Sequence, residues 1–198
     1  MGSSRSLPGK QPLLTQPCLF GEVLGSVSGG DLSIDLSRVG GPVADSDAQQ
    51  PYWALIPAEG EGDIIAHHDL APWNLVIGPR WAFIDRDLAA PGTRLWDVAY
   101  AMHGFVPLSA NPRWQRHDAP MRLRVFADAY GLDEAQRRDL VPMLARRTRA
   151  LRDFLASQAA VGVQPWAGLW ETGHGEAWQA DADYIQANEA TWAAALLG

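Results

Sequence analysis

The sequence predicts an α+β fold that is mostly helical, with a short β-hairpin ahead of the helices. Two short apolar runs, 75–77 and 81–84, are rich in β-branched and aromatic residues and flank the turn-forming Gly78-Pro79-Arg80. Beyond the hairpin, apolar residues recur at intervals of three and four, which is the period of amphipathic helices. Because the chain before the hairpin shows neither pattern, we expect a loop-rich segment at 1–62 and a folded lobe at 63–198.

The segment 1–62 is rich in turn formers, with ten glycines, six prolines and eight serines. The runs 32–39 and 52–56 are each long enough for a short strand. The stretch GSVSGGD, Gly25 to Asp31, has glycines at the first and sixth positions of a phosphate-binding loop, but Asp31 stands where that loop requires a lysine. Since a carboxylate there would repel phosphate, we interpret the stretch as a plain turn.

The first helix is expected to begin after Thr93, a residue type that caps helix N-termini. Its apolar stripe would comprise Leu95, Val98, Met102 and Phe105. Asp97 falls in the first turn of this helix, where a carboxylate has two interpretations. It would favour the helix dipole, or it would hydrogen-bond the loop before the hairpin and fix the shape of that loop.

Further helices are predicted along the rest of the chain. One is expected over Met121–Tyr130 and ends at a glycine, after which Asp133 and Gln136 have the spacing of a capping box. We interpret Pro142 as the first position of a new helix, because proline is well tolerated there. The last helix is expected from Glu176 to about Leu197.

Two sets of charged residues lie in this helical region. The basic set lies mostly off the predicted apolar face and consists of Arg146, Arg147, Arg149 and Arg152. We interpret it as a solvated helix surface, with a phosphate-binding or partner surface as the alternative. The acidic set consists of Asp153, Glu171, Glu176, Asp181, Asp183 and Glu189. Solvated helix faces are again the first interpretation, and contact with a cationic substrate is the second.

Composition limits the class of protein. The formal charge of -7 over 198 residues argues against a nucleic-acid partner, because proteins that bind nucleic acids usually carry an excess of basic residues. The single cysteine, Cys18, permits no intrachain disulfide. Prolines interrupt the N-terminal stretch in which a signal sequence or a membrane span would lie. We therefore predict a cytoplasmic protein with no membrane partner, and no feature of the sequence predicts an oligomeric state.

Polar residues suited to phosphoryl transfer surround the predicted hairpin. His67, Asp69 and Asn74 fit the pattern H-x-D-x-x-x-x-N, and Asp85 follows the second apolar run. Antiparallel pairing would bring Asn74 and Asp85 together at the open end of the hairpin, with Asp69 on the loop that enters it. Such oxygen-bearing side chains suit Mg²⁺, which shares its coordination sphere with substrate phosphates.

A resemblance to a known family rests on two runs, HHDLAPWNLVI and AFIDRDLAAPGTRLWDVAYAMHGFVPL. They resemble the catalytic core of the aminoglycoside phosphotransferase and choline kinase-like enzymes, which share the protein-kinase-like fold. The resemblance covers roughly 64–108 and implies that 63–198 is a catalytic C-terminal lobe. It also implies Mg²⁺ with ATP or another nucleoside triphosphate, and a small, cationic hydroxyl substrate such as an aminoglycoside or an amino alcohol.

The resemblance assigns roles to individual residues. It makes Asp69 the catalytic aspartate, which accepts or orients the proton of the substrate hydroxyl, and it makes Asn74 and Asp85 the Mg²⁺ ligands. It also implies that His67 and Asp97 support the catalytic loop.

Other positions of the core are less defined by the resemblance. Asp87 would assist the metal or bind substrate, although it also suits a turn. His68 has no assigned role, and Arg86 stands where relatives often carry an aromatic residue.

The nucleotide-binding half of such a fold is expected to be reduced or missing. A kinase-like nucleotide lobe needs a strand-borne lysine and a glycine-rich loop. The sequence has no G-x-G-x-x-G in 1–62, and its sole lysine, Lys10, lies between two prolines where a strand is disfavoured. Three interpretations follow: an active small-molecule kinase, a truncated family member without activity of its own, and a non-enzymatic lobe that binds a ligand or a protein.

Overall fold

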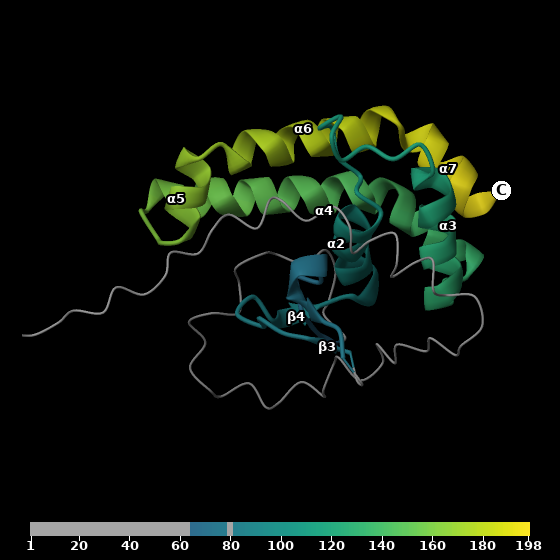
Figure 1. Ribbon diagram of the computed structural model, residues 1–198, viewed down its shortest axis with the longest axis horizontal. Coiled ribbons are helices and arrows are strands. Elements are labelled where there is room, and N and C mark those ends of the chain that lie inside the picture. Colours follow the sequence, from purple (N-terminus) through teal and green to yellow (C-terminus); the bar gives the residue numbers. More distant parts are fainter. Residues whose placement is uncertain (1–63, 79–80) are drawn as a thin grey trace, which may run out of the picture. The chain divides into compact units, whose positions relative to one another are not determined.

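Helices dominate the computed structural model, which describes residues 64–78 and 81–198 (Figure 1). Small antiparallel sheets accompany the helices, so the predicted α+β class with mostly helical content is confirmed. The segment 1–62, with its expected strands and turn, lies outside the described residues, as do Pro79 and Arg80 of the predicted hairpin turn.

Two small antiparallel sheets are formed by four short strands. The strands are β1 (Ile64–Ala66), β2 (Leu75–Val76), β3 (Ala82–Phe83) and β4 (Ala90–Gly92). β1 pairs with β4, and β2 pairs with β3 to form the predicted hairpin. Each hairpin strand is shorter than its apolar run, and Leu75 lies opposite Phe83. The next backbone hydrogen bond, from the N–H of Ile84 to the oxygen of Asn74 at 2.9 Å, closes the open end of the hairpin.

Local capping signals determine where several of the helices begin and end. The described helices are the 3₁₀ helix η2 (Pro72–Asn74) and the α-helices α2 (Arg94–Phe105), α3 (Ala119–Tyr130), α4 (Glu134–Ala160), α5 (Trp166–Glu171), α6 (His174–Ala187) and α7 (Glu189–Leu197). Thr93 caps α2 through its hydroxyl, and Asp133 with Gln136 forms the expected capping box at α4. Gly131 ends α3 with a positive φ of 79°, which glycine adopts without strain.

The interpretation of Pro142 as the start of a helix is wrong, because this residue lies inside the continuous helix α4. A proline in a helix interior removes one backbone hydrogen bond, which disfavours the helix locally. The residues on both sides of it are buried, namely Leu140, Val141, Met143 and Leu144. Their packing offsets the local cost, so tertiary contacts override the breaker.

The prediction of one long helix from Glu176 to Leu197 is also wrong in its continuity. The helix begins slightly earlier and is interrupted at Asn188, which separates α6 from α7. The side chain of Asn188 donates to the carbonyl oxygen of Tyr184, a local bond that competes with the helical pattern. α5 lies ahead of these helices and was not anticipated, because its six residues are too few to show a period.

α4 is the central element of the helical lobe. It packs against α2, α5, α6 and α7, and it lies side by side with α6 along much of its length (Figure 1). Fully buried side chains such as Leu144 on α4, Leu123 on α3 and Ile185 on α6 belong to one hydrophobic cluster. Replacing one such leucine by alanine typically costs about 2 to 5 kcal/mol of stability.

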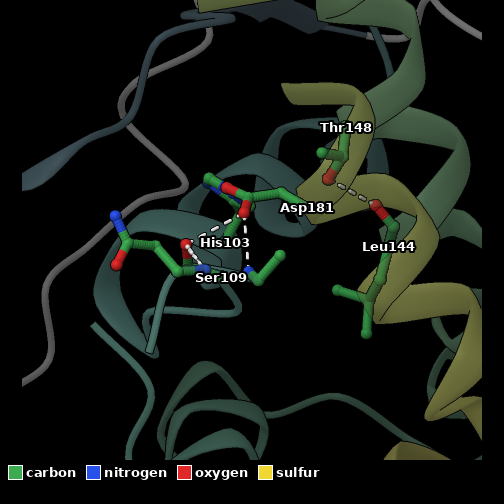
Figure 2. Close-up of polar contacts among 7 residues, drawn as sticks. His103, Ser109, Leu144, Thr148 and Asp181 are labelled. Atoms are coloured by element: carbon green, nitrogen blue, oxygen red, sulfur yellow. Dashed lines mark hydrogen bonds and ion pairs between the residues drawn. The ribbon is translucent and has the colours of Figure 1, made fainter. Parts of the chain in front are cut away.

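A polar cluster attaches α6 to α2 and to the chain that follows it (Figure 2). The carboxylate of Asp181 on α6 accepts from the Ser109 hydroxyl at 2.9 Å and from the Ala110 backbone N–H at 2.7 Å. Its other oxygen pairs with His103 Nε2 at 2.9 Å. Asp181 therefore has a structural use and is not part of a free acidic surface.

None of the helices in the described part of the chain combines the length and the apolar composition that crossing a lipid bilayer demands.

Candidate functional site

The loop from His67 to Asn74 leaves β1 and enters the hairpin through η2. Its first two peptide groups, those of His67 and His68, donate to the two carboxylate oxygens of Asp97, each at 2.8 Å. Asp97 is buried in the first turn of α2. Of the two interpretations of Asp97, the one in which it hydrogen-bonds the loop before the hairpin therefore matches the observed bonds. Bonds of this kind, to an ionised acceptor, are about twice as strong as neutral ones and hold the loop on α2.

The ring of His67 links the loop to the end of β3. Its Nδ1 accepts the backbone N–H of Asp69 at 3.3 Å, and its Nε2 lies 3.2 Å from the carbonyl oxygen of Ile84. Because Nδ1 is an acceptor, the ring proton belongs on Nε2, which donates to Ile84. The edge of the ring also packs on Phe83, with centroids 6.0 Å apart. His67 is thus occupied in holding two segments together.

Both carboxylate oxygens of Asp69 are held by neighbouring side chains. Oδ1 accepts from the Tyr100 hydroxyl at 2.6 Å, and Oδ2 accepts from Asn74 Nδ2 at 2.7 Å. The same Asn74 nitrogen also donates to the backbone oxygen of Asp69 at 3.0 Å. Asp69 and Asn74, which lie five residues apart, are therefore in direct contact, and the orientation of the carboxylate is set from two sides.

Asn74 keeps one oxygen available. Its side chain is only 5% exposed, and its Oδ1 makes no hydrogen bond within the described part of the chain. The amide orientation follows from the two acceptors that Nδ2 faces, since both are oxygens of Asp69.

Asp85 lies directly after the last pairing of the hairpin. Since Ile84 bonds to Asn74, Asp85 lies one residue beyond this pair. Asp85 is exposed and has a φ of 62°, in the left-handed region that aspartate tolerates better than most residues. Backbone strain of this kind is frequent at functional sites.

Asp87 lies three residues after Ile84, beyond the backbone bond between Ile84 and Asn74. It is exposed within the turn that the backbone bond from Ala89 to Arg86 closes. Among the described residues, no group of three or more His, Cys, Asp or Glu side chains converges on one point in the way a metal site made by the protein alone would need.

One arginine that the sequence analysis placed on a solvated helix surface contacts the loop instead. Arg147 on α4 is fully buried and donates from Nη2 to the carbonyl oxygen of His68 at 2.6 Å. Its guanidinium carbon lies 4.5 Å from the centroid of the Tyr100 ring and 5.4 Å from that of Trp96. The interpretation of Arg147 as part of a solvated surface is wrong. Its spacing of three and four from Leu144 and Leu151 was the signal, since it places Arg147 on the apolar face of the helix.

His68 has an unusual backbone conformation and a buried ring. Its φ of 61° lies in the left-handed region, which few residues other than glycine, asparagine and aspartate adopt readily. The ring is buried against the backbone of Ala90 and Pro91. The close approach of β4 is possible because Gly92 has no side chain, since a Cβ there would come within 3.0 Å of His68 Nε2.

Burial and charge perturb three groups in this region. Burial is the main cause that raises the pKa of Tyr100 well above its usual value, and the Asp69 carboxylate raises it further. Burial lowers the pKa of the Arg147 guanidinium, against the opposing influence of Tyr100, Asp97 and Asp69. The pKa of His68 is lowered mainly by burial, and Arg147 adds to this, whereas Asp97 counteracts it. Tyr100 therefore stays a proton donor beside Asp69.

Most of the remaining arginines and acidic residues occupy the helix surface, as their first interpretations expected. Arg149 pairs with Asp183 at 3.5 Å, and Arg152 pairs with Asp153 at 2.8 Å. The acidic residues that remain exposed on the last helices are Glu171, Glu176 and Glu189. Exposed pairs of this kind contribute little to stability.

Comparison of the chain with protein-family models, with curated proteins and with solved structures found no match.

Proposed function

We propose that 63–198 forms the catalytic C-terminal lobe of a protein-kinase-like phosphotransferase. It would transfer the γ-phosphate of ATP or another nucleoside triphosphate to a hydroxyl of a small molecule. The observation that carries the proposal is the direct contact of Asp69 with Asn74, together with the exposed Asp85 that follows the Ile84–Asn74 backbone bond by one residue. This arrangement joins an oriented base to two oxygen groups suited to a divalent cation.

The chemistry of Asn74 and Asp85 fits Mg²⁺. Asn74 offers a neutral amide oxygen with no hydrogen bond in the described part of the chain, and Asp85 offers an exposed carboxylate. Mg²⁺ is usually bound by one or two protein oxygens and takes its other ligands from water and phosphate, so two protein groups suffice. Bound there, the ion would neutralise charge on the phosphate oxygens during transfer.

We assign to Asp69 the role of the base that activates the substrate hydroxyl, because its carboxylate is oriented by two neighbouring donors. In the proposed step the substrate oxygen attacks the γ-phosphorus, and the bond from that phosphorus to the β,γ-bridging oxygen breaks, which releases the nucleoside diphosphate. Asp69 accepts the hydroxyl proton and later returns it to solvent. Its oxygens already accept from Tyr100 and Asn74, but a carboxylate has about four lone-pair sites, so acceptor capacity remains.

An apolar surface beside the metal ligands suits the base of a nucleotide. Val76 lies opposite Ala82 in the hairpin, and Ile84, which follows β3, bonds to the backbone of Asn74. All three apolar residues are exposed, with Val76 and Ile84 about half accessible at 48% and 49%. Flat apolar surface of this kind binds purine rings by stacking and burial. The formal charge of -7 is compatible with a cationic acceptor such as an amino alcohol or an aminoglycoside.

Thermal unfolding with nucleotide tests the binding part of the proposal. At a Mg²⁺–ATP concentration near 100 times Kd, binding stabilises by about 2.7 kcal/mol, and Tm should rise by about 5 to 10 °C. Asp85→Asn should abolish the rise, because it removes the charge yet keeps a residue type that tolerates the left-handed backbone. Asp139→Asn, which alters an exposed carboxylate on α4, is the matched control and should keep the rise. No rise in the wild-type protein at millimolar nucleotide would contradict the proposal.

Turnover tests the catalytic part. Labelled γ-phosphate should appear in product when the protein is incubated with ATP, Mg²⁺ and a panel of amino alcohols and aminoglycosides. Asp69→Asn should keep the thermal shift and lose product formation, since it removes the base but no metal ligand. Full turnover in that variant would show that Asp69 does not have the assigned role.

A further inference from the structure

Tyr100 connects the carboxylate of Asp69 to the helices beneath the loop. Its hydroxyl donates to Asp69 Oδ1 at 2.6 Å across 31 residues of sequence, and its side chain is buried. Among the described residues, it is the α2 side chain that hydrogen-bonds to Asp69. We propose that Tyr100 is a positioning residue for Asp69, which fixes the rotation of the carboxylate so that its remaining lone pairs face the acceptor hydroxyl. This inference rests on the proposed function.

The ring of Tyr100 packs against two other side chains, which restrict the movement of its hydroxyl. The Arg147 guanidinium lies 4.5 Å from the ring centroid, a cation–π contact inside the protein. The indole of Trp178 on α6 stacks against the ring with centroids 5.9 Å apart and an interplanar angle of 17°. A rigid donor orients a carboxylate at little entropic cost during the reaction, because its own freedom was lost on folding.

The stack continues from Tyr100 toward α6 and ties the position of Asp69 to the packing of that helix. Trp178 also stacks on His103, with centroids 4.6 Å apart, and His103 Nε2 pairs with Asp181, the residue that attaches α6 to the α2–α3 connection (Figure 2). Successive contacts therefore run from Asp181 through His103, Trp178 and Tyr100 to Asp69. α6 thus contributes to the geometry of the base although none of its side chains is bonded to Asp69 in the described part of the chain.

The chemistry of the bond between Tyr100 and Asp69 favours a positioning role for Tyr100 over a purely structural one. A hydrogen bond from a phenol to a carboxylate is charge-assisted and short, as the 2.6 Å separation shows. Tyr100 therefore orients Asp69 through a directional bond to one of its two carboxylate oxygens.

The test compares Tyr100→Phe with Tyr184→Phe. Phenylalanine keeps the ring and its stack and removes the hydroxyl donor. Tyr184 is a half-buried tyrosine that packs on Trp192 and lies outside the site, so its variant is the matched control. In Tyr100→Phe, kcat should fall about 10- to 100-fold while KM for ATP changes by less than about twofold. A loss in kcat without a matching change in KM is what a positioning role predicts, whereas a general loss of packing would affect both.

The outcomes separate this inference from the proposed function. If the wild-type protein phosphorylates an acceptor and Tyr100→Phe keeps full kcat, the positioning role is overturned and the proposed function stands. If the wild-type protein phosphorylates no acceptor, both are overturned. Equal losses of kcat in Tyr100→Phe and Tyr184→Phe would also overturn the inference, because they would indicate a general effect on the fold.

A second measurement tests the contact without turnover. Tyrosines labelled with ¹³C at Cζ report their ionisation by NMR, and the Tyr100 signal is identified by its absence in Tyr100→Phe. In Asp69→Asn the Tyr100 phenol should begin to ionise at lower pH than in the wild-type protein, because a neighbouring negative charge that raises its pKa is gone. An unchanged titration would overturn the contact and with it the positioning role.

Discussion

The guanidinium of Arg147 donates to the carbonyl oxygen of His68 at 2.6 Å, across 79 residues of sequence. This bond joins the middle of α4, the central helix of the lobe, to the loop that carries Asp69. It places a buried cation beneath two carboxylates, Asp69 and Asp97, whose charges oppose the effect of burial on Arg147. The loop is thus held from one side by the Asp97 carboxylate and from the other by an arginine.

Arg147→Met should lower the free energy of unfolding by about 2 to 4 kcal/mol. It removes a hydrogen bond made by a charged group and leaves the buried oxygen of His68 without its donor. Arg149→Met on the same helix is the control. Arg149 is partly exposed and its pair with Asp183 is a surface pair, so the change should stay within about 0.5 kcal/mol. Urea denaturation of both variants measures the difference, and equal losses would contradict a specific role of Arg147.

Asp97→Ala should lower the free energy of unfolding by about 3 kcal/mol, because two buried backbone N–H groups lose a charged acceptor. Asp97→Asn should lose less, since its amide oxygen can still accept one of the two bonds. Asp139→Ala, at an exposed position of α4, should change stability by less than about 0.5 kcal/mol. The ranking of the three variants in urea denaturation is the measurement, and it fails if Asp97→Asn loses as much as Asp97→Ala.

The lowered pKa of His68 predicts how stability depends on pH. Between the folded-state pKa and the ordinary value of 6.5, the unfolded chain binds more protons at this residue than the folded protein does. The free energy of unfolding should therefore rise with pH in this window and fall as the pH drops below about 6.5. His68→Asn, which tolerates the left-handed backbone, should flatten this dependence.

His117→Asn is the matched control for the pH experiment. His117 is exposed on the α2–α3 connection, so its variant should keep the slope of the wild-type protein. Unfolding free energies measured from pH 5 to pH 8 give the comparison. A slope that persists in His68→Asn would show that another group causes it.

Gly175→Ala should destabilise the packing of α5 on α6 by about 1 to 3 kcal/mol, because a Cβ at this position would overlap the ring of Trp170. Gly168→Ala, on α5, is the matched control. Its Cβ would meet only the flexible end of Gln164, and alanine is the better helix former, so stability should stay equal or rise by up to about 1 kcal/mol. Thermal unfolding of the two variants measures the contrast, and a stable Gly175→Ala protein would contradict the close packing.

Several features could be predicted because they depend on residues close together in sequence. The cap at Thr93, the capping box at Asp133 and the end of α3 at Gly131 each involve groups within about four residues of one another. The hairpin is equally local, and its register places Ile84 opposite Asn74, one residue before Asp85. The contact of Asp69 with Asn74 lies within one turn of the same loop.

Other features depended on partners far along the chain, and the sequence by itself did not decide them. Burial of Arg147, continuity of α4 through Pro142 and the bond from Tyr100 to Asp69 all require surfaces that exist only after the helices pack. A side chain's local pattern sets which face of a helix it occupies, whereas its charge partners and its desolvation are set by what packs on that face. The sequence thus determined the elements and the polar residues of the loop, and the tertiary structure decided which helices hold the loop and which side chain orients Asp69.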